Sequence, residues 1–183
     1  MRFEGAMEPL LHFAVPFAIV SMLRLRLKWS FIVGLLGILP DFDLLFSMHR
    51  SVSHSIIPAI TLFLASLLLR KKKRGFILQI IALGWGSHTI LDFIGSYTPI
   101  LWPLSSQSHT LFFESRLSIE GSPSIHLRLE VLEEEYDYGL FTTFDAPLLT
   151  LSGLTIGLIL ITLSLYLQFG YLGKNTQKKH LKN

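Results

Sequence analysis

The sequence has 183 residues, of which 50% are hydrophobic, with a mean hydropathy of +0.51 and a formal net charge of +3. A soluble domain of this length is more polar, and the apolar residues here come in continuous runs, which excludes an ordinary soluble domain. The absence of cysteine excludes disulfides, zinc–thiolate sites and cysteine nucleophiles.

Five apolar segments follow one another along the chain, over residues 9–23, 29–40, 55–69, 76–95 and 148–169. The last two are long enough to cross about 30 Å of hydrocarbon at about 1.5 Å per residue. The first three are short, and each taken alone also suits a buried core helix or a re-entrant segment. Packed together they can still span, because polar groups at their ends then line a protein cavity. The sequence therefore predicts an all-α membrane bundle of about five transmembrane helices.

The basic residues predict the orientation of these helices. Twelve of the 16 lysines and arginines fall in three pieces: three between the first two segments, five between the third and fourth, and four after the fifth. None of the 13 acidic residues lies in these pieces. The positive-inside rule assigns such pieces to the cytoplasm, so we expect a multi-pass cell-membrane protein with its N-terminus outside and its C-terminus inside. Because topology explains the basic charge, no nucleic-acid partner is expected.

An insertion over residues 96–147 separates the fourth and fifth segments on the outer side. Apolar and polar residues alternate over 111–120 and again over 127–131, with a Gly-Ser-Pro-Ser turn sequence between them. This pattern predicts an extracytoplasmic β-hairpin over the outer mouth of the bundle. The chain then has three parts: a four-helix core over 1–95, the insertion over 96–147, and a fifth helix with a basic cytoplasmic tail over 148–183.

Histidines and aspartates gather at the predicted outer ends of the first four segments. His88 and Asp92 are four residues apart, so both side chains share one face of a helix. The basic pieces predict the orientation without reference to these residues. The gathering of the histidines and aspartates at the outer ends of the segments is therefore an independent observation. The candidates are His12, Asp41, Asp43, His54, His88 and Asp92.

Imidazole and carboxylate ligands without sulfur favour zinc, manganese or iron. Ionisable groups at membrane depth are costly, which favours a functional role. Each residue also has a structural explanation: an interfacial His12, turn capping by Asp41 and Asp43, and a hydrogen-bonded pair of His88 and Asp92 that joins helices. These explanations must each hold separately, whereas one metal site explains all the candidates together. We therefore predict a divalent metal site at these residues.

The order of these residues resembles the YdjM-like family of membrane-bound metal-dependent hydrolases. The resemblance covers roughly residues 6–108 and rests on His12, Pro40-Asp41-Phe42-Asp43, His49-Arg50, His54-Ser55 and Gly86-Ser87-His88-Thr89-Ile90-Leu91-Asp92. That family is similar, at greater distance, to the zinc-dependent phospholipases C and single-strand nucleases. This similarity implies zinc ligation by His12, by Asp41 or Asp43, by His54, and by the helical pair His88 and Asp92. The second helical histidine–carboxylate pair of those enzymes has no counterpart here, so the resemblance implies one or two divalent ions, with zinc as the leading candidate and manganese or iron as alternatives.

The resulting hypothesis is a hydrolase of phosphoesters, including those of membrane lipids, with its site at the outer membrane face. Asp41 is the candidate general base, and Arg50, one of few basic residues outside the cytoplasmic pieces, is the candidate for binding a phosphate oxygen. The sequence does not decide whether His49, His109 or His126 is a ligand, and the last two are expected at the surface of the hairpin.

Two other classes of protein are alternatives to the hydrolase. An ion, proton or metal transporter needs a polar path, and the inner halves of the segments contain few polar residues. A non-catalytic membrane scaffold would use the basic loops to bind anionic lipid, and it leaves the histidine cluster unexplained.

Overall fold

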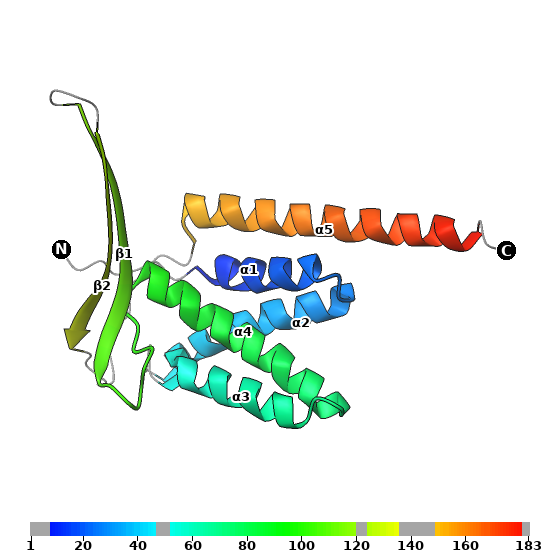
Figure 1. The fold of residues 1–183 in the computed structure, drawn as a ribbon, viewed down its shortest axis with the longest axis horizontal. Coiled ribbons are helices and arrows are strands. Elements are labelled where there is room, and N and C mark those ends of the chain that lie inside the picture. Colours follow the sequence, from blue (N-terminus) through cyan, green and yellow to red (C-terminus); the bar gives the residue numbers. More distant parts are fainter. Residues whose placement is uncertain (1–7, 47–51, 120–123, 136–148, 181–183) are drawn as a thin grey trace.

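The computed structural model describes residues 8–46, 52–119, 124–135 and 149–180. Within these residues the chain forms five α-helices and a two-stranded antiparallel sheet, so the predicted mostly helical architecture with a hairpin is confirmed. The strands cross one end of the helix bundle (Figure 1). The elements are α1 (Pro9–Met22), α2 (Leu27–Ile38), α3 (Ile56–Leu68), α4 (Lys73–Gly95), β1 (Gln107–Ser118), β2 (Ser124–Glu135) and α5 (Leu151–His180).

Three helical stretches are long and apolar enough to cross a membrane: Leu27–Phe46, Lys73–Gly95 and Leu151–Gly170. The first is longer than predicted because α2 continues into the 3-10 helix η1 (Leu39–Phe46). Proline is tolerated in the first turn of a helix, so Pro40 does not end the helical path. Helices α1 and α3 remain short and apolar.

Glycines set the distances between the helices. A Cβ atom on Gly37 of α2 would overlap the carbonyl oxygen of His12 in α1, and a Cβ on Gly84 of α4 would lie 2.6 Å from the Cβ of Leu36 in α2. A Cβ on Gly157 of α5 would likewise lie too close to α1. Small residues permit such close approach in membrane bundles. Gly37 therefore brings α2 against α1 at the turn that carries His12.

The two ends of the bundle differ in chemistry. The α1–α2 connection, the α3–α4 connection and the C-terminal end of α5 lie at the end away from the hairpin (Figure 1). These are the three basic pieces of the sequence, whereas the start of α1, η1, the start of α3 and the end of α4 lie at the hairpin end. The predicted separation of the basic pieces from the histidine and aspartate residues is confirmed.

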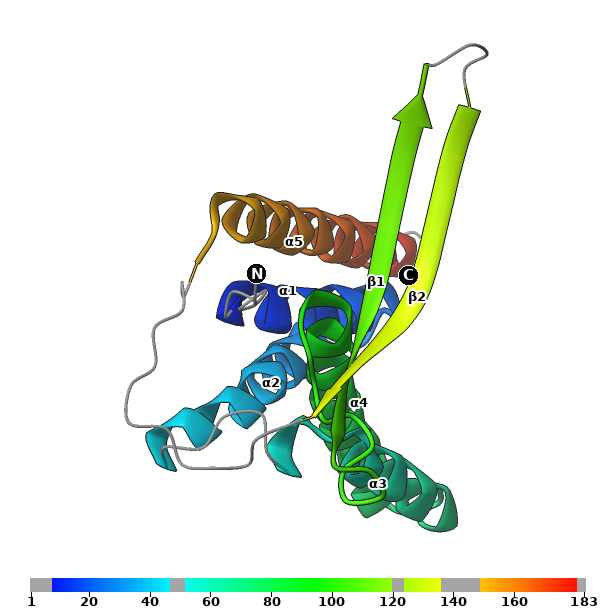
Figure 2. The same cartoon turned by 90° about the vertical axis from the view of Figure 1, so that its left-hand side faces the viewer.

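The hairpin is longer than its alternating pattern predicted, with pairing from Gln107↔Glu135 to Ser118↔Ser124. Its base is fixed to the bundle by the backbones of Thr98 and His109, which exchange hydrogen bonds of 2.8 and 2.9 Å. Because this base packs on α4, His109 is buried, and its predicted surface position is wrong. His126 is exposed, as predicted. Figure 2 shows that the hairpin passes over the end of α4 and that its distal half extends sideways beyond the helices.

Candidate metal centre

Four elements bring histidines and aspartates together at the hairpin end of the bundle. His12 lies in the first turns of α1, Asp41 in η1, His54 at the end of the 3-10 helix η2 (Val52–His54), and His88 and Asp92 in α4. All five side chains are buried, and His54 and His88 are completely inaccessible. The structure therefore contains a buried His/Asp cluster that can hold a metal ion.

Asp92 is the central carboxylate of this cluster. Its Oδ1 lies 3.0 Å from Nε2 of His12, and its Oδ2 lies 3.1 Å from Nε2 of His54 and 3.3 Å from Nε2 of His88. The last contact follows from helical geometry, because residues four apart stand one above the other. One carboxylate thus faces three imidazoles from three elements.

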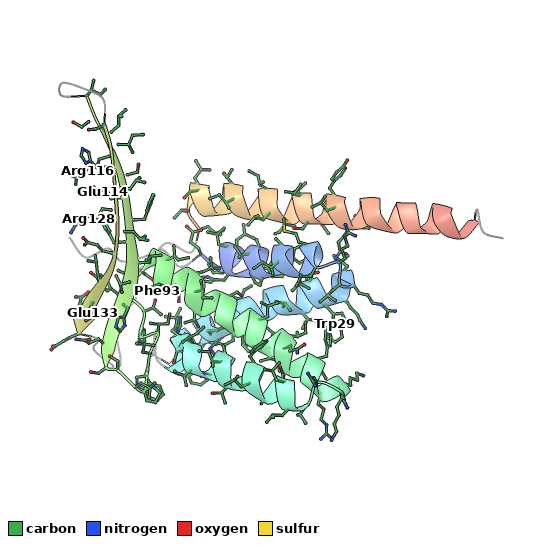
Figure 3. The ribbon with its side chains drawn as sticks, in the orientation of Figure 1. Trp29, Phe93, Glu114, Arg116, Arg128 and Glu133 are labelled. Atoms are coloured by element: carbon green, nitrogen blue, oxygen red, sulfur yellow. The ribbon has the colours of Figure 1, made fainter. Side chains whose placement is uncertain are left out.

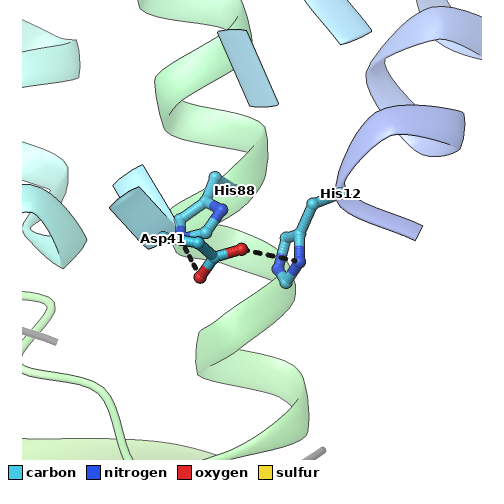
Figure 4. A group of neighbouring side chains, drawn as sticks. All are labelled: His12, Asp41 and His88. Atoms are coloured by element: carbon cyan, nitrogen blue, oxygen red, sulfur yellow. Dashed lines mark ion pairs between the residues drawn. The ribbon is translucent and has the colours of Figure 1, made fainter. Parts of the chain in front are cut away.

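Asp41 faces the same imidazoles at slightly longer range. Its Oδ1 lies 3.7 Å from Nε2 of His54 and 3.8 Å from Nε2 of His88, and its Oδ2 lies 3.8 Å from Nδ1 of His12. Figure 4 shows the carboxylate between the rings of His12 and His88. Those two rings are themselves close, with centroids 4.3 Å apart.

The neighbours of two histidines fix which nitrogen faces the cluster. Nδ1 of His88 lies 2.8 Å from the backbone oxygen of Gly37, an acceptor, so Nδ1 carries the proton and Nε2 presents a lone pair. Nδ1 of His54 lies 3.3 Å from Oδ2 of Asp43, which also accepts a 2.6 Å hydrogen bond from Ser53. A histidine whose Nδ1–H is held by a carbonyl or carboxylate is the usual arrangement of a metal-ligating imidazole.

Several polar atoms of the cluster are buried without a hydrogen-bond partner in the described part of the chain: Nε2 of His88, both ring nitrogens of His12, and Oδ2 of Asp41 and of Asp92. Such an atom costs about 1–3 kcal/mol when it stays unsatisfied. Two ligands about 2.1 Å from one tetrahedral ion are separated by about 3.4 Å. The separations of 3.0 to 3.8 Å between these nitrogens and oxygens span that value, so the residues fit a first-row divalent ion.

The charge of the cluster also suits a cation. Among the described residues neither Asp41 nor Asp92 has a lysine or arginine partner, and buried carboxylates need positive charge nearby. Burial lowers the pKa of the His54 imidazole, but its contacts with Asp41, Asp43 and Asp92 outweigh burial and raise that pKa to about 10. The surrounding carboxylates therefore favour positive charge at this position.

The donor atoms form two overlapping groups, each within 4.8 Å: His12, Asp41 and His88, and His54, His88 and Asp92. His88 belongs to both but offers only Nε2, because Nδ1 is bonded to Gly37. Either one ion uses donors from both groups, or His88 serves one of two ions. The predicted number of one or two ions stays a prediction.

The structure brings together five of the six predicted metal ligands, while Asp43 lies behind His54 and outside both groups. His49 and Arg50 lie outside the described residues. His109 is 3.6 Å from Glu133 at the base of the hairpin and is not part of either group. Sequence reasoning missed the Gly37 carbonyl, for which the sequence carries no signal.

The fold and the cluster define a multi-pass membrane protein with a buried site suited to a divalent cation. Residues 7–175 match the YdjM inner membrane protein family, and the chain belongs to this family. The match extends beyond the resemblance seen in the sequence, because it includes the hairpin and most of α5. Searches of curated proteins and of solved structures found no match. The more distant likeness to phospholipases C and nucleases therefore stays a prediction.

The position of Asp43 predicts a graded effect on metal binding. Asp43→Asn weakens the hold on the His54 Nδ1–H without removing a donor, so we expect metal affinity to fall by about 10- to 100-fold. Asp92→Asn removes the central carboxylate and should cost more. Competition with a chromogenic chelator measures both affinities in purified protein. An Asp43→Asn variant as severely impaired as Asp92→Asn, or one equal to wild type, would contradict the orienting role.

Proposed function

We propose that this protein is a membrane-bound, metal-dependent hydrolase of phosphoesters, acting at the extracytoplasmic face of the membrane. The observation that carries the proposal is the convergence of buried, unpartnered nitrogens and oxygens from His12, Asp41, His88 and Asp92, with Nε2 of His54 in the same cluster. Ionisable groups are costly at membrane depth, and one divalent ion would pair with these donor atoms and offset the charge of both carboxylates.

The residues divide into separate roles. Asp92 and the imidazoles of His12, His54 and His88 make the shorter contacts, so they are the proposed ligands. A bound divalent ion supplies Lewis acidity, which polarises a phosphoryl oxygen and makes water a stronger acid. Asp41 stands 3.7 to 3.8 Å from the imidazoles, which leaves room for it to accept a proton from the attacking water as general base.

The place of the cluster in the bundle supports a phosphoester of the membrane itself as substrate. His12 lies in the first turn of α1 and Asp92 in the last turn of α4, at the end of the bundle away from the basic connections. In the proposed orientation this end faces the outer headgroups, whose phosphates lie just beyond the hydrocarbon. A phospholipid can therefore bring its phosphate to the site without leaving the bilayer, which is the reason to propose lipid phosphoesters before soluble ones.

The distribution of polar groups favours an enzyme over a transporter. Beyond the cluster, the buried polar side chains of the described part of α1, α2, α3 and α5 are hydroxyls and one amide, without a carboxylate or imidazole. These residues are Ser21, Ser30, Ser66, Ser164 and Gln168. A cation or proton that left the cluster toward the basic end would meet no buried carboxylate or imidazole on the described part of these helices. Transport paths are lined by such side chains.

The proposed orientation follows from the basic end of the bundle. By the positive-inside rule that end is cytoplasmic, which puts the N-terminus, the cluster and the hairpin on the extracytoplasmic side. A membrane-impermeant maleimide added to intact cells should then label Arg116→Cys, in the hairpin, and the native chain offers no competing cysteine. Labelling only after the cells are opened would reverse the orientation.

Hydrolysis is tested with purified protein on bis(p-nitrophenyl) phosphate and on phospholipid in mixed micelles. We expect activity that chelator abolishes and metal restores, and Asp41→Asn should lower kcat by about 100-fold or more because it removes the general base. His126→Ala, an exposed histidine on the hairpin, is the matched control and should keep full activity. Metal-dependent ion flux in proteoliposomes without hydrolysis of either substrate would favour the transporter instead.

A further inference from the structure

The hairpin presents one apolar face that no other described element covers. In the antiparallel register Phe113 pairs with Leu129, Leu117 with Ile125 and Leu111 with Val131, and alternate residues of a strand point to the same face. The side chains along this face stay 53 to 70% exposed at Phe113, Leu117, Ile125, Leu127, Leu129 and Val131. Exposure of this size on neighbouring residues marks a surface that binds something apolar.

The opposite face of the hairpin is charged and suited to water. Arg116 and Glu114 form an ion pair of 2.6 Å, and Arg128 and Glu130 form one of 2.7 Å. Figure 3 shows Arg116, Glu114 and Arg128 on the side of the hairpin that points away from the helices. Beyond Glu114 and Arg128 the apolar face therefore points to the side from which the helices extend, whereas at the base Thr110, on the same strand face as Glu114, donates a hydrogen bond to the backbone oxygen of Phe93 in α4.

That side is where a membrane surrounds the helices. The strands run across the helix direction, and the distal half of the hairpin reaches beyond the helices in both views (Figures 1 and 2). The helix nearest to this side, α5, is itself apolar and exposed, with Leu151 82% and Ile156 49% accessible. The apolar face of the hairpin thus looks onto the same apolar environment that covers α5.

We propose that the hairpin lies in the plane of the membrane interface, with its apolar face on the lipid acyl chains and its charged face in water. This arrangement is the strand counterpart of an interfacial amphipathic helix. A two-stranded sheet has unpaired backbone groups along both edges, which need water or headgroups and exclude full insertion into hydrocarbon. The orientation of the faces favours lipid over a second protein chain, which could approach from any side.

Single cysteines on the two faces test this proposal cleanly, because the chain has no native cysteine. Leu117→Cys and Arg116→Cys are adjacent residues on opposite faces, and Leu129→Cys and Arg128→Cys form a second pair in the other strand. Each full-length variant is labelled with the environment-sensitive dye NBD and reconstituted into phosphatidylcholine vesicles. Quenching is then measured with iodide in the water and with doxyl groups on the lipid acyl chains.

We expect the dye at Leu117→Cys and Leu129→Cys to be quenched by doxyl lipid and protected from iodide, and the dye at Arg116→Cys and Arg128→Cys to behave in the opposite way. Equal iodide quenching on both faces would overturn the proposal, because the hairpin would then stand in water. Protection of the leucine positions from both quenchers would also overturn it, and would indicate a second copy of the chain or another protein over this face.

Discussion

The burial of several carboxylates with three imidazoles at one end of a membrane bundle is the constraint on which the structure depends. Asp92 contacts three imidazoles and Asp41 faces the same rings, yet neither has a lysine or arginine partner among the described residues. Buried negative charge of this density is unfavourable unless a cation or bound protons offset it. A divalent ion would offset the charge of both carboxylates and accept the lone pairs of the imidazoles at the same time.

The rest of the fold holds these donors in position. Gly37 allows α1 and α2 to approach at the turn that carries His12, and its carbonyl oxygen also orients the ring of His88. Asp43 and Ser53 hold the ring of His54 from the other side. The cluster is therefore supported by groups on α2, η1 and η2, so a change in helix packing acts directly on the donor geometry.

Much of the arrangement could be predicted from the sequence because its causes are local or follow from charge. The four-residue spacing of His88 and Asp92 dictates a shared helix face, and the basic pieces fix which helix ends lie together. Other features depend on contacts between distant residues. The continuation of α2 through Pro40 into η1, the Gly37 carbonyl behind His88 and the burial of His109 on α4 have no local sequence signal.

The hairpin also combines a feature that the sequence predicts with one that depends on contacts between distant residues. Its alternating pattern predicted two strands, and the structure contains them. The pattern could not tell which face points toward the helices, because both faces of an isolated hairpin are exposed. Only the attachment of its base through Thr98, His109 and α4 sets the direction of the apolar face.

The most direct test of the account is the metal content of the purified protein, measured by plasma mass spectrometry without chelator in any step. Wild type should contain a near-stoichiometric first-row divalent metal, His88→Ala should lose most of it because it removes a donor common to both groups, and His126→Ala should match wild type. Monodisperse elution of all three proteins from a sizing column would show that the loss is local. Wild-type protein without bound metal, even after incubation with zinc or manganese, would contradict the account.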